Sequence, residues 1–419
     1  MVPPTLQHPS GHGDAPADTT HHQQGKMKIL LMGEYSNVHW TLAEGLRTLG
    51  HEVTVLSNGD FWKDYPRDIN LVRTPTKWGG ICYMARLLRL LPQLKGYDIV
   101  QLINPMFLEL KAERIRPIYQ YLRHYNGKMV LGAFGMDYYW VSTCCNEKPL
   151  RYSDFNIGDQ LRTDECALRE RHDWLGTAKE RLNRLIAEDC DGIVTGLYEY
   201  HVCYHPRFPE KTQFIPYPIR MDERLKIKDE RLNLDTEHTE KTENTEHITS
   251  VASVFSENSV ERGVSLFIGI NRTRSVYKGT DIMLRAAQGI KAQYPDRVNL
   301  QIAESVPFEQ YQKMLEGADA ILDQLYSYTP SMNPLMAMSK GVICIGGGEP
   351  ENYEILNEHH LRPIINVQPT YESVYHELEM LVLHPERIPE LKRQSIEYIR
   401  RHHEYQKVAR EYEAFYQKL

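Results

Sequence analysis

The sequence has 419 residues, of which 41% are hydrophobic and 25% are charged, a composition typical of a soluble globular protein with room for two domains. Its formal net charge of −7 at pH 7 argues against a general nucleic-acid-binding protein. Seven scattered cysteines without a CxxC pair argue against a disulfide framework and a structural zinc site. No apolar stretch reaches the length of about 20 residues that spans a bilayer. We therefore expect a cytoplasmic protein.

Residues 1–26 are rich in Pro, Gly, His, Thr and Gln and are predicted to form a disordered leader. From Lys28 the pattern alternates between buried strands and helices, as KILLMGEY, VHWTLAEGLRTLGHEV and VTVLS show, which predicts a βαβ unit and an α/β domain over residues 27–220. Gly33 after the first strand is a single glycine and not a GxGxxG fingerprint. The sequence therefore does not support a dinucleotide cofactor.

The segment 77–95 combines apolar residues at helical spacing with Lys77, Arg86, Arg89 and Lys95. This pattern predicts an amphipathic basic helix. Two interpretations remain open. The helix lies on an anionic membrane surface at the inner face of the membrane, or it packs on the sheet with its cations in solvent.

A third informative stretch is KMVLGAFGMDYYW, in which a buried strand ends just before Asp137. At the end of a parallel strand, Asp137 could contact a ligand hydroxyl or cap the next helix. The following segment from Val141 to Leu175 is polar and irregular at first, and we predict that it is a loop insertion that contributes to ligand specificity.

Residues 221–262 contain a charged T-E repeat without an apolar stripe and are predicted to be a flexible linker. A buried strand then ends at Gly269, and a basic turn with Arg272 and Arg274 leads to Lys278. Cations at this point could neutralise a nucleoside diphosphate as it leaves. The alternative is a solvated basic loop.

The stretch from Ala318 to Glu351 contains a buried strand, a polar turn, a short helix and a second buried strand in quick succession. The amides of Ser331, Met332 and Asn333 would lie at the start of the short helix, where the positive end of the helix dipole suits a diphosphate. The alternative is an ordinary strand-helix-strand unit.

The residues ADAILDQLYSYTPSMNPLMAMSKG resemble the donor-site signature of glycosyltransferase family 4, A-D-x-x-x-x-P-S-x-x-E-G-F-G-x-x-x-x-E-A-M-A-x-G. The two glutamates of this signature are absent, since Tyr328 and Met336 stand in their places. Lys278 matches the lysine of the family's G-R-x-x-x-x-K-G turn, and Asp137 matches the aspartate of its H-G-S-D motif. The chain looks like a divergent member of this family.

The resemblance implies an α/β protein of the GT-B fold, with two Rossmann-like domains facing across a cleft. The acceptor would bind to residues 27–220, the donor nucleotide to residues 263–395, and a helix over residues 396–419 would pack back on the first domain. The implied activity is transfer of a sugar, with retention, from a UDP- or GDP-linked donor to a glycan, lipid-linked or other hydroxyl acceptor. No metal or cofactor would be needed. The alternative is a catalytically silent relative that binds a nucleotide sugar or a partner enzyme.

Twelve residues are candidates for this site, with Glu349 and Glu351 as substitutes for the missing glutamates. The candidate catalytic residues are Lys278, Arg272 and Asp137, and the candidate donor-binding residues are Gly269, Arg274, Glu304, Tyr328, Ser331, Met332, Asn333, Glu349 and Glu351.

Overall fold

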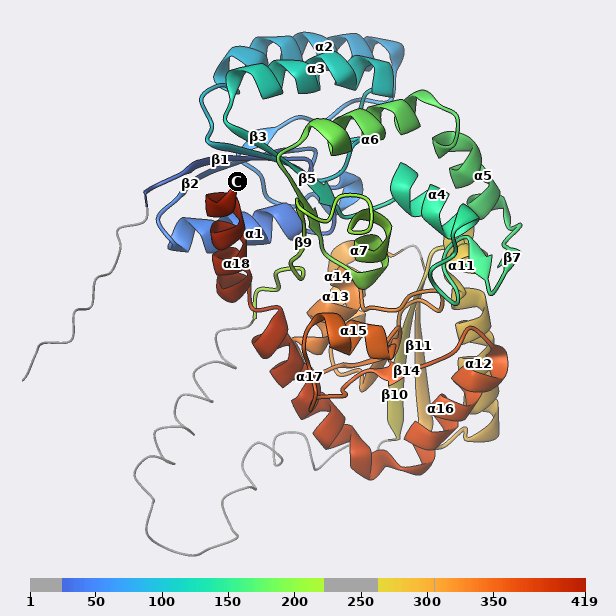
Figure 1. The fold of residues 1–419 in the computed structure, drawn as a ribbon. Coiled ribbons are helices and arrows are strands. Elements are labelled where there is room, and N and C mark those ends of the chain that lie inside the picture. Colours follow the sequence, from blue (N-terminus) through green and yellow to red (C-terminus); the bar gives the residue numbers. More distant parts are fainter. Residues whose placement is uncertain (1–24, 222–262, 305) are drawn as a thin grey trace, which may run out of the picture.

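A computed structural model describes residues 25–221 and 263–419, with the exception of Ser305. The predicted leader and the predicted linker therefore lie almost entirely outside the described residues. Within the described ranges, each half of the chain forms one parallel sheet with helices on both of its faces (Figure 1). The prediction of two Rossmann-like α/β units is confirmed.

The described part of the first half forms a seven-stranded sheet in the order β3-β2-β1-β4-β5-β8-β9. Its strands are β1 (Lys28–Met32), β2 (Glu52–Ser57), β3 (Ile69–Asn70), β4 (Ile99–Leu102), β5 (Lys128–Ala133), β8 (Gly192–Thr195) and β9 (Thr212–Phe214). The strand order reverses between β1 and β4, which is the point where open α/β sheets bind ligands. The buried residues of KILLM and VTVLS form β1 and β2, as their apolar runs predicted.

Helices cover both faces of this sheet, with α2 and α3 on one side and α1 on the other (Figure 1). Their bounds are α1 (Val38–Thr48), α2 (Lys77–Leu90), α3 (Ala112–Tyr125), α4 (Tyr138–Asn146), α5 (Glu165–Trp174), α6 (Ala178–Asp189) and α7 (Tyr198–Tyr204). Single 3-10 turns lie at η1 (Phe61–Lys63) and η2 (Leu91–Gln93).

The predicted loop insertion from Val141 to Leu175 is wrong in its structure. Residues of this segment continue helix α4, form the short antiparallel pair β6 (Asn156–Ile157) and β7 (Gln160–Leu161), and then form α5. The reason is local, because Val141 and Cys144 are fully buried on one face of α4, and the carboxylate of Asp164 caps α5 by accepting a hydrogen bond from the amide of Ala167.

The described part of the second half forms a five-stranded sheet in the order β11-β10-β12-β13-β14. Its strands are β10 (Val264–Ile270), β11 (Val298–Glu304), β12 (Ala320–Leu322), β13 (Ile343–Gly346) and β14 (Ile365–Asn366). The helices and 3-10 turns are η3 (Arg272–Arg274), α11 (Ser275–Lys278), α12 (Thr280–Gln293), α13 (Phe308–Leu315), α14 (Met332–Met338), α15 (Pro350–Ile355), α16 (Tyr371–Leu383), η4 (Pro385–Arg387), α17 (Ile388–His402) and α18 (Tyr405–Lys418). The predicted short helix after the signature turn is α14, which ends at Met338, and Gly341, whose φ is 78°, lies in the turn that follows.

The C-terminal helices connect the two halves. Residues 396–419 are divided between α17 and α18, and the carboxylate of Glu404 caps α18. Helix α17 is tied to the second half, because Nζ of Lys392 lies 2.7 Å from Oδ1 of Asp319. Helix α18 lies on the first half, where the hydroxyl of Tyr416 donates to Oε1 of Gln101 at 2.8 Å. The last helix of the chain therefore packs on the half that contains β1 (Figure 1).

Candidate functional site

A cavity of about 750 Å³ lies between the two halves, and we call it the cleft. Its walls come from residues that follow the carboxyl ends of strands in both sheets. Tyr35 and Ser36 follow β1, Gly135 follows β5, and Asp323 follows β12. Ligands of open α/β sheets bind at this edge. The cleft is therefore the first candidate for a functional site.

The second half contributes cations to the cleft. Arg274 and Lys278 both line it, since Arg274 directly precedes the single turn α11 and Lys278 is the last residue of that turn. Gly279 has a φ of 72°, and a Cβ atom there would lie 2.6 Å from Cβ of Leu325, so the turn that presents Lys278 requires glycine. Burial lowers the pKa of the Lys278 ammonium, while the charge of Asp323 opposes this shift. Lys278 is therefore partly dehydrated and would gain from an anionic ligand.

Asp323 is a cleft residue that the sequence analysis missed. It follows β12, and its carboxylate accepts hydrogen bonds from Oγ of Ser331 at 3.4 Å and from Nδ2 of Asn333 at 3.5 Å. Burial raises the pKa of Asp323. Nδ2 of Asn333 also lies 2.9 Å from the hydroxyl of Tyr311. A polar residue directly after the buried run AIL was the signal that could have identified it.

Two loops of the first half meet at the opposite wall. Ser36 and Asn37 after β1, and Asp60 and Phe61 after β2, have φ values of 52°, 70°, 58° and 59°. Such conformations cost about 1–3 kcal/mol each for residues other than glycine and cluster at functional sites. Oδ2 of Asp60 accepts hydrogen bonds from the amide of Ser36 at 2.9 Å and from Nζ of Lys63 at 2.6 Å. The two strained loops are therefore held together.

Lys63 adds a cation from the first half to those of the second. It lines the cleft, and its charge acts to lower the pKa of Lys278. A nearby cation lowers the pKa of an ammonium group, because it disfavours the charged form. Lys63 and Lys278 therefore both line the cleft, from opposite halves of the chain.

Six of the twelve candidate residues line the cleft. They are Gly269, Arg274, Lys278, Ser331, Met332 and Asn333. Arg272 and Glu304 do not line it, since they form an ion pair with each other at the molecular surface. The position of Arg272 and Glu304 therefore does not support the expectation that they contact the donor.

Asp137 is not among the residues that line the cleft, and it is fully buried. It caps α4, because its Oδ1 accepts a hydrogen bond from the amide of Trp140 at 2.8 Å, and its Oδ2 accepts one from the hydroxyl of Tyr204 at 2.7 Å. Burial raises the pKa of Asp137 to about 6. Of the two roles considered for this residue, the structure contains the helix cap. A contact with an acceptor hydroxyl remains a prediction.

Tyr328, Glu349 and Glu351 lie at the interface between the two halves instead of in the cleft. The hydroxyl of Tyr328 accepts a hydrogen bond from the amide of Arg151 at 2.7 Å. The guanidinium of Arg151 lies 2.7 Å from Oε2 of Glu349 and 2.6 Å from Oε1 of Glu351. Glu349 also accepts a hydrogen bond from Tyr152, and although burial acts in the opposite direction, these donors hold its pKa below the ordinary value. Glu349 and Glu351, which were predicted to substitute for the missing glutamates, are therefore both paired with Arg151 in this structure.

Glu199 is a second functional candidate that the sequence did not reveal. It lies in the first turn of α7, borders the cleft and is 5% exposed. Its carboxylate accepts hydrogen bonds from the loop that follows β12, including the amides of Tyr328 at 2.7 Å and Thr329 at 3.0 Å. An acidic residue in the first turn of a helix is common, so nothing in the sequence near Glu199 indicated this contact across the interface.

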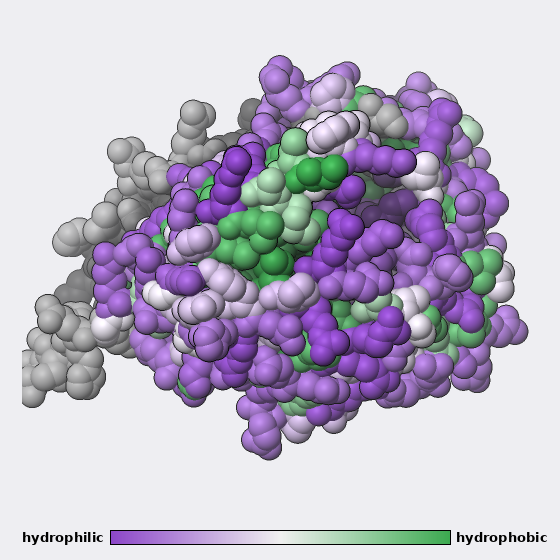
Figure 2. Space-filling model, turned by 90° about the horizontal axis from the view of Figure 1, so that it is seen from above, coloured by the Kyte–Doolittle hydropathy of each residue, from purple (hydrophilic) through white to green (hydrophobic). Residues whose placement is uncertain are grey.

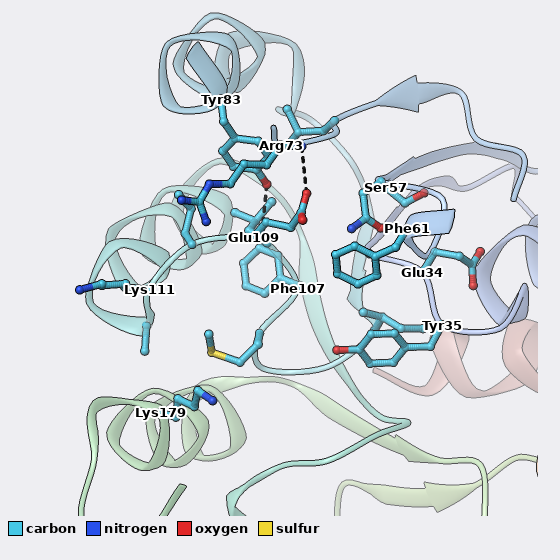
Figure 3. A pocket seen from close by; sticks show the side chains of 18 of the residues that line it. Glu34, Tyr35, Ser57, Phe61, Arg73, Tyr83, Phe107, Glu109, Lys111 and Lys179 are labelled. Atoms are coloured by element: carbon cyan, nitrogen blue, oxygen red, sulfur yellow. Dashed lines mark hydrogen bonds between the residues drawn. The ribbon is translucent and has the colours of Figure 1, made fainter. Parts of the chain in front are cut away.

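A second cavity of about 570 Å³ lies within the first half, at the carboxyl ends of β1, β2 and β4 (Figure 3). The aromatic rings of Tyr35, Phe61 and Phe107 gather around it, and Arg73, Lys111 and Lys179 lie toward its edge (Figure 3). Oε2 of Glu109 accepts a hydrogen bond from the amide of Arg73 at 3.0 Å. Tyr35 borders both cavities, so the second cavity adjoins the cleft.

The similarities to known proteins concern the fold. No protein-family model matches the chain, and no curated protein matches its sequence. Among solved structures, the sucrose-phosphate synthase of Thermosynechococcus elongatus is similar with a TM-score of 0.55 and 12% identity, over 93% of this chain and 98% of that one. HepE of Anabaena in complex with UDP-glucose is similar with a TM-score of 0.54 and 12% identity, over 94% and 100%. UDP-GlcNAc 2-epimerase of Neisseria meningitidis, bound to UDP-GlcNAc, has a TM-score of 0.52 and 12% identity, over 94% and 100%.

These similarities define the class of the molecule. It has the GT-B fold, in which two Rossmann-like sheets face each other across a cleft, as the sequence predicted. The sucrose-phosphate synthase and the UDP-GlcNAc 2-epimerase share this fold. At 12% identity the similarity does not extend to an activity, so membership of glycosyltransferase family 4 remains an expectation from the signature.

Proposed function

We propose that the protein is a glycosyltransferase that moves a sugar from a UDP- or GDP-linked donor in the cleft to a hydroxyl acceptor on the first half. The observation that carries this proposal is that Arg274 and Lys278 of the second half and Lys63 of the first half line one cleft, which lies at the carboxyl ends of both sheets. The structural similarity to HepE with UDP-glucose supports a nucleotide sugar as the ligand.

The cations of the cleft suit the departure of a diphosphate. When the bond between sugar and diphosphate breaks, negative charge grows on the leaving phosphate oxygens. Fixed cations in a partly dehydrated site stabilise this charge more than water does, because little reorganisation is needed. Lys278 is the central group in this mechanism, and Arg274 would assist with a planar set of donors. Asp323 would hold the side chains of Ser331 and Asn333 in position beside the ligand.

The acceptor would approach from the first half, past Tyr35 and Ser36. The second cavity adjoins the cleft at Tyr35, so an acceptor could place a hydroxyl in the cleft while its remaining part occupies this cavity. The lining of the second cavity combines aromatic and aliphatic side chains with charges of both signs at the rim. Such a lining fits an acceptor with an apolar part, within the predicted range of glycan, lipid-linked and other hydroxyl acceptors.

The test uses the purified full-length chain. UDP and GDP should raise its melting temperature if the cleft binds a nucleoside diphosphate. Lys278→Ala should lower the rate of sugar transfer or donor hydrolysis at least about tenfold, equivalent to about 1.4 kcal/mol of transition-state stabilisation. Lys313→Ala is the matched control, because Lys313 is ion-paired with Glu309 within α13 and does not line the cleft. Unchanged turnover in Lys278→Ala would contradict the proposal, and proton NMR of the product would test the predicted retention.

A second candidate function is binding of a nucleotide sugar, or of a partner enzyme, without turnover. It is favoured by one observation. The positions of both signature glutamates hold Tyr328 and Met336, and the nearby Glu349 and Glu351 are ion-paired with Arg151. Protection by UDP or GDP without hydrolysis or transfer of any UDP- or GDP-linked sugar would support this candidate.

A further inference from the structure

Helix α2 has an apolar stripe on its outer side, which we call the α2 face and define as Trp78, Ile81, Ala85 and Leu88. The exposed fractions of Trp78, Ile81 and Leu88 are 75%, 59% and 54%, and Ala85 is also exposed. These positions follow helical spacing and therefore lie along one side of α2. Seen from above, the molecule carries an apolar patch on the side where α2 and α3 lie (Figure 2).

The residues of the α2 face do not attach helix α2 to the domain. Helix α2 is attached to the domain by its other side, where Tyr83 and Leu87 are 3% and 0% exposed. A surface helix of a globular protein normally turns its polar residues outward. Here the apolar residues point both inward and outward, so the outer stripe points to a ligand surface.

The charges beside the α2 face identify the kind of surface. Lys77, Arg86 and Arg89 are exposed on the same helix, and the sequence contains no acidic residue from 77 to 97. In the described part of the chain, none of these three side chains forms an ion pair. An amphipathic helix with apolar residues and cations, but no acidic residues, binds at the interface of anionic bilayers. A second copy of the same face would be repelled by its like charges.

We propose that the α2 face binds the surface of a membrane that contains anionic lipids, with Trp78, Ile81 and Leu88 in the boundary between headgroups and acyl chains. No helix among the described residues is long and apolar enough to cross a bilayer. Tyr83, on the inner side of α2, lines the second cavity. A molecule held in the membrane would therefore lie close to that cavity. The binding itself does not depend on the proposed sugar transfer.

The experiment is flotation of the full-length chain with vesicles. The chain should float with vesicles of phosphatidylcholine containing about 30% phosphatidylglycerol, and not with phosphatidylcholine alone. The double variant Trp78→Ser/Leu88→Ser, which removes apolar contacts, and the double variant Arg86→Glu/Arg89→Glu, which reverses two charges, should each lower the bound fraction at least about tenfold. Leu168→Ser is the matched control, since Leu168 is 47% exposed on α5, and its binding should equal that of the original chain.

Three results would overturn the proposal. The original chain could fail to float with anionic vesicles, or both double variants could float as it does. Alternatively, sedimentation could show a dimer that Trp78→Ser/Leu88→Ser converts to a monomer, which would assign the face to a second copy. Protection by UDP or GDP is measured on the same variants and should be unchanged. A failure of membrane binding is thus distinguishable from a failure of the proposed function.

Discussion

The carboxylate of Glu199, in the first half, accepts a hydrogen bond from the backbone amide of Tyr328, in the second half, at 2.7 Å. Oε1 of Glu199 also accepts hydrogen bonds from the amide of Thr329 at 3.0 Å and from the hydroxyl of Ser327 at 2.8 Å. One buried carboxylate therefore binds three consecutive residues of the other half. This loop continues into Ser331 and Asn333 in the cleft, so the interface and the candidate site share one segment.

Replacement of Glu199 by Gln should loosen this segment. A carboxamide has one oxygen acceptor, so its NH2 group would take the place of Oε2 of Glu199, and the hydroxyl of Thr329 that donates to Oε2 would lose its acceptor. Such a loss costs about 1–3 kcal/mol. We expect Glu199→Gln to lower the free energy of unfolding in urea by about 2 kcal/mol and to weaken protection by UDP or GDP. Glu147→Gln, which removes an exposed ion pair with Arg207, is the control. Equal stability of Glu199→Gln and the original chain would show that the contact is dispensable.

Arg151 provides a second contact between the halves, which we expect to be weaker than that of Glu199. Its side chain is 54% exposed, whereas Glu349, its partner, is 4% exposed and also bonded by Tyr152 and Gln368. We expect Arg151→Met to lower the free energy of unfolding by about 1 kcal/mol, because the exposed end of the pair is screened by water.

The salt dependence of unfolding separates this electrostatic contribution from packing. In 1 M salt the difference between Arg151→Met and the original chain should shrink, since charges at the surface are then screened within a few ångströms. The control is Arg393→Met, because Arg393 is paired with Glu390 three residues earlier, within α17. A difference that is independent of salt would mean that Arg151 acts through packing on Tyr328, whose ring lies 4.8 Å from its guanidinium.

The order of elements could be predicted because each one is encoded by nearby residues. The apolar run KILLM is long enough for a buried strand, and the turn at Lys278 and Gly279 requires a left-handed glycine that the sequence displays. Contacts between the halves could not be predicted, because Arg151 and Glu349 are separated by 198 positions and nothing near either residue specifies the other. The substitution of Tyr328 for a glutamate was visible, but its hydrogen bond to Arg151 depends on the docking of two domains.

The stability of the second half should depend on pH through Glu358. This carboxylate is 2% exposed and lies 2.7 Å from Nε2 of His402 and 3.0 Å from a guanidinium nitrogen of Arg401, both in α17. Although burial opposes the shift, the hydrogen bond from His402 and the amides of Leu361 and His360 lower the pKa of Glu358 to about 2.

A carboxylate with a lowered pKa in the folded state stabilises the protein above its ordinary pKa, and this contribution is lost as the pH falls toward the lower value. We therefore expect Glu358→Gln to be less stable than the original chain by about 2 kcal/mol at pH 7. The difference should decrease as the pH falls from about 5 to about 2. Urea unfolding at several pH values measures it. A difference that stays constant over this range would show that Glu358 contributes through shape and not through its charge.

The docking of α18 on α1 depends on a glycine. A Cβ atom at Gly45, within α1, would lie 2.7 Å from Cβ of Ala409 and 2.7 Å from the carbonyl oxygen of Tyr405, both in α18. Alanine favours a helix over glycine by about 1 kcal/mol, so a helix effect alone would make Gly45→Ala stabilising. Because backbone and a buried methyl cannot move aside easily, we expect the overlap to dominate and lower the free energy of unfolding by about 1–3 kcal/mol.

Gly80→Ala in α2 is the control, since its nearest neighbour is the flexible end of Arg73 at 3.4 Å, and it should be neutral or stabilising. Hydrogen exchange of α18 locates the effect, and unchanged protection of this helix in Gly45→Ala would contradict the close packing.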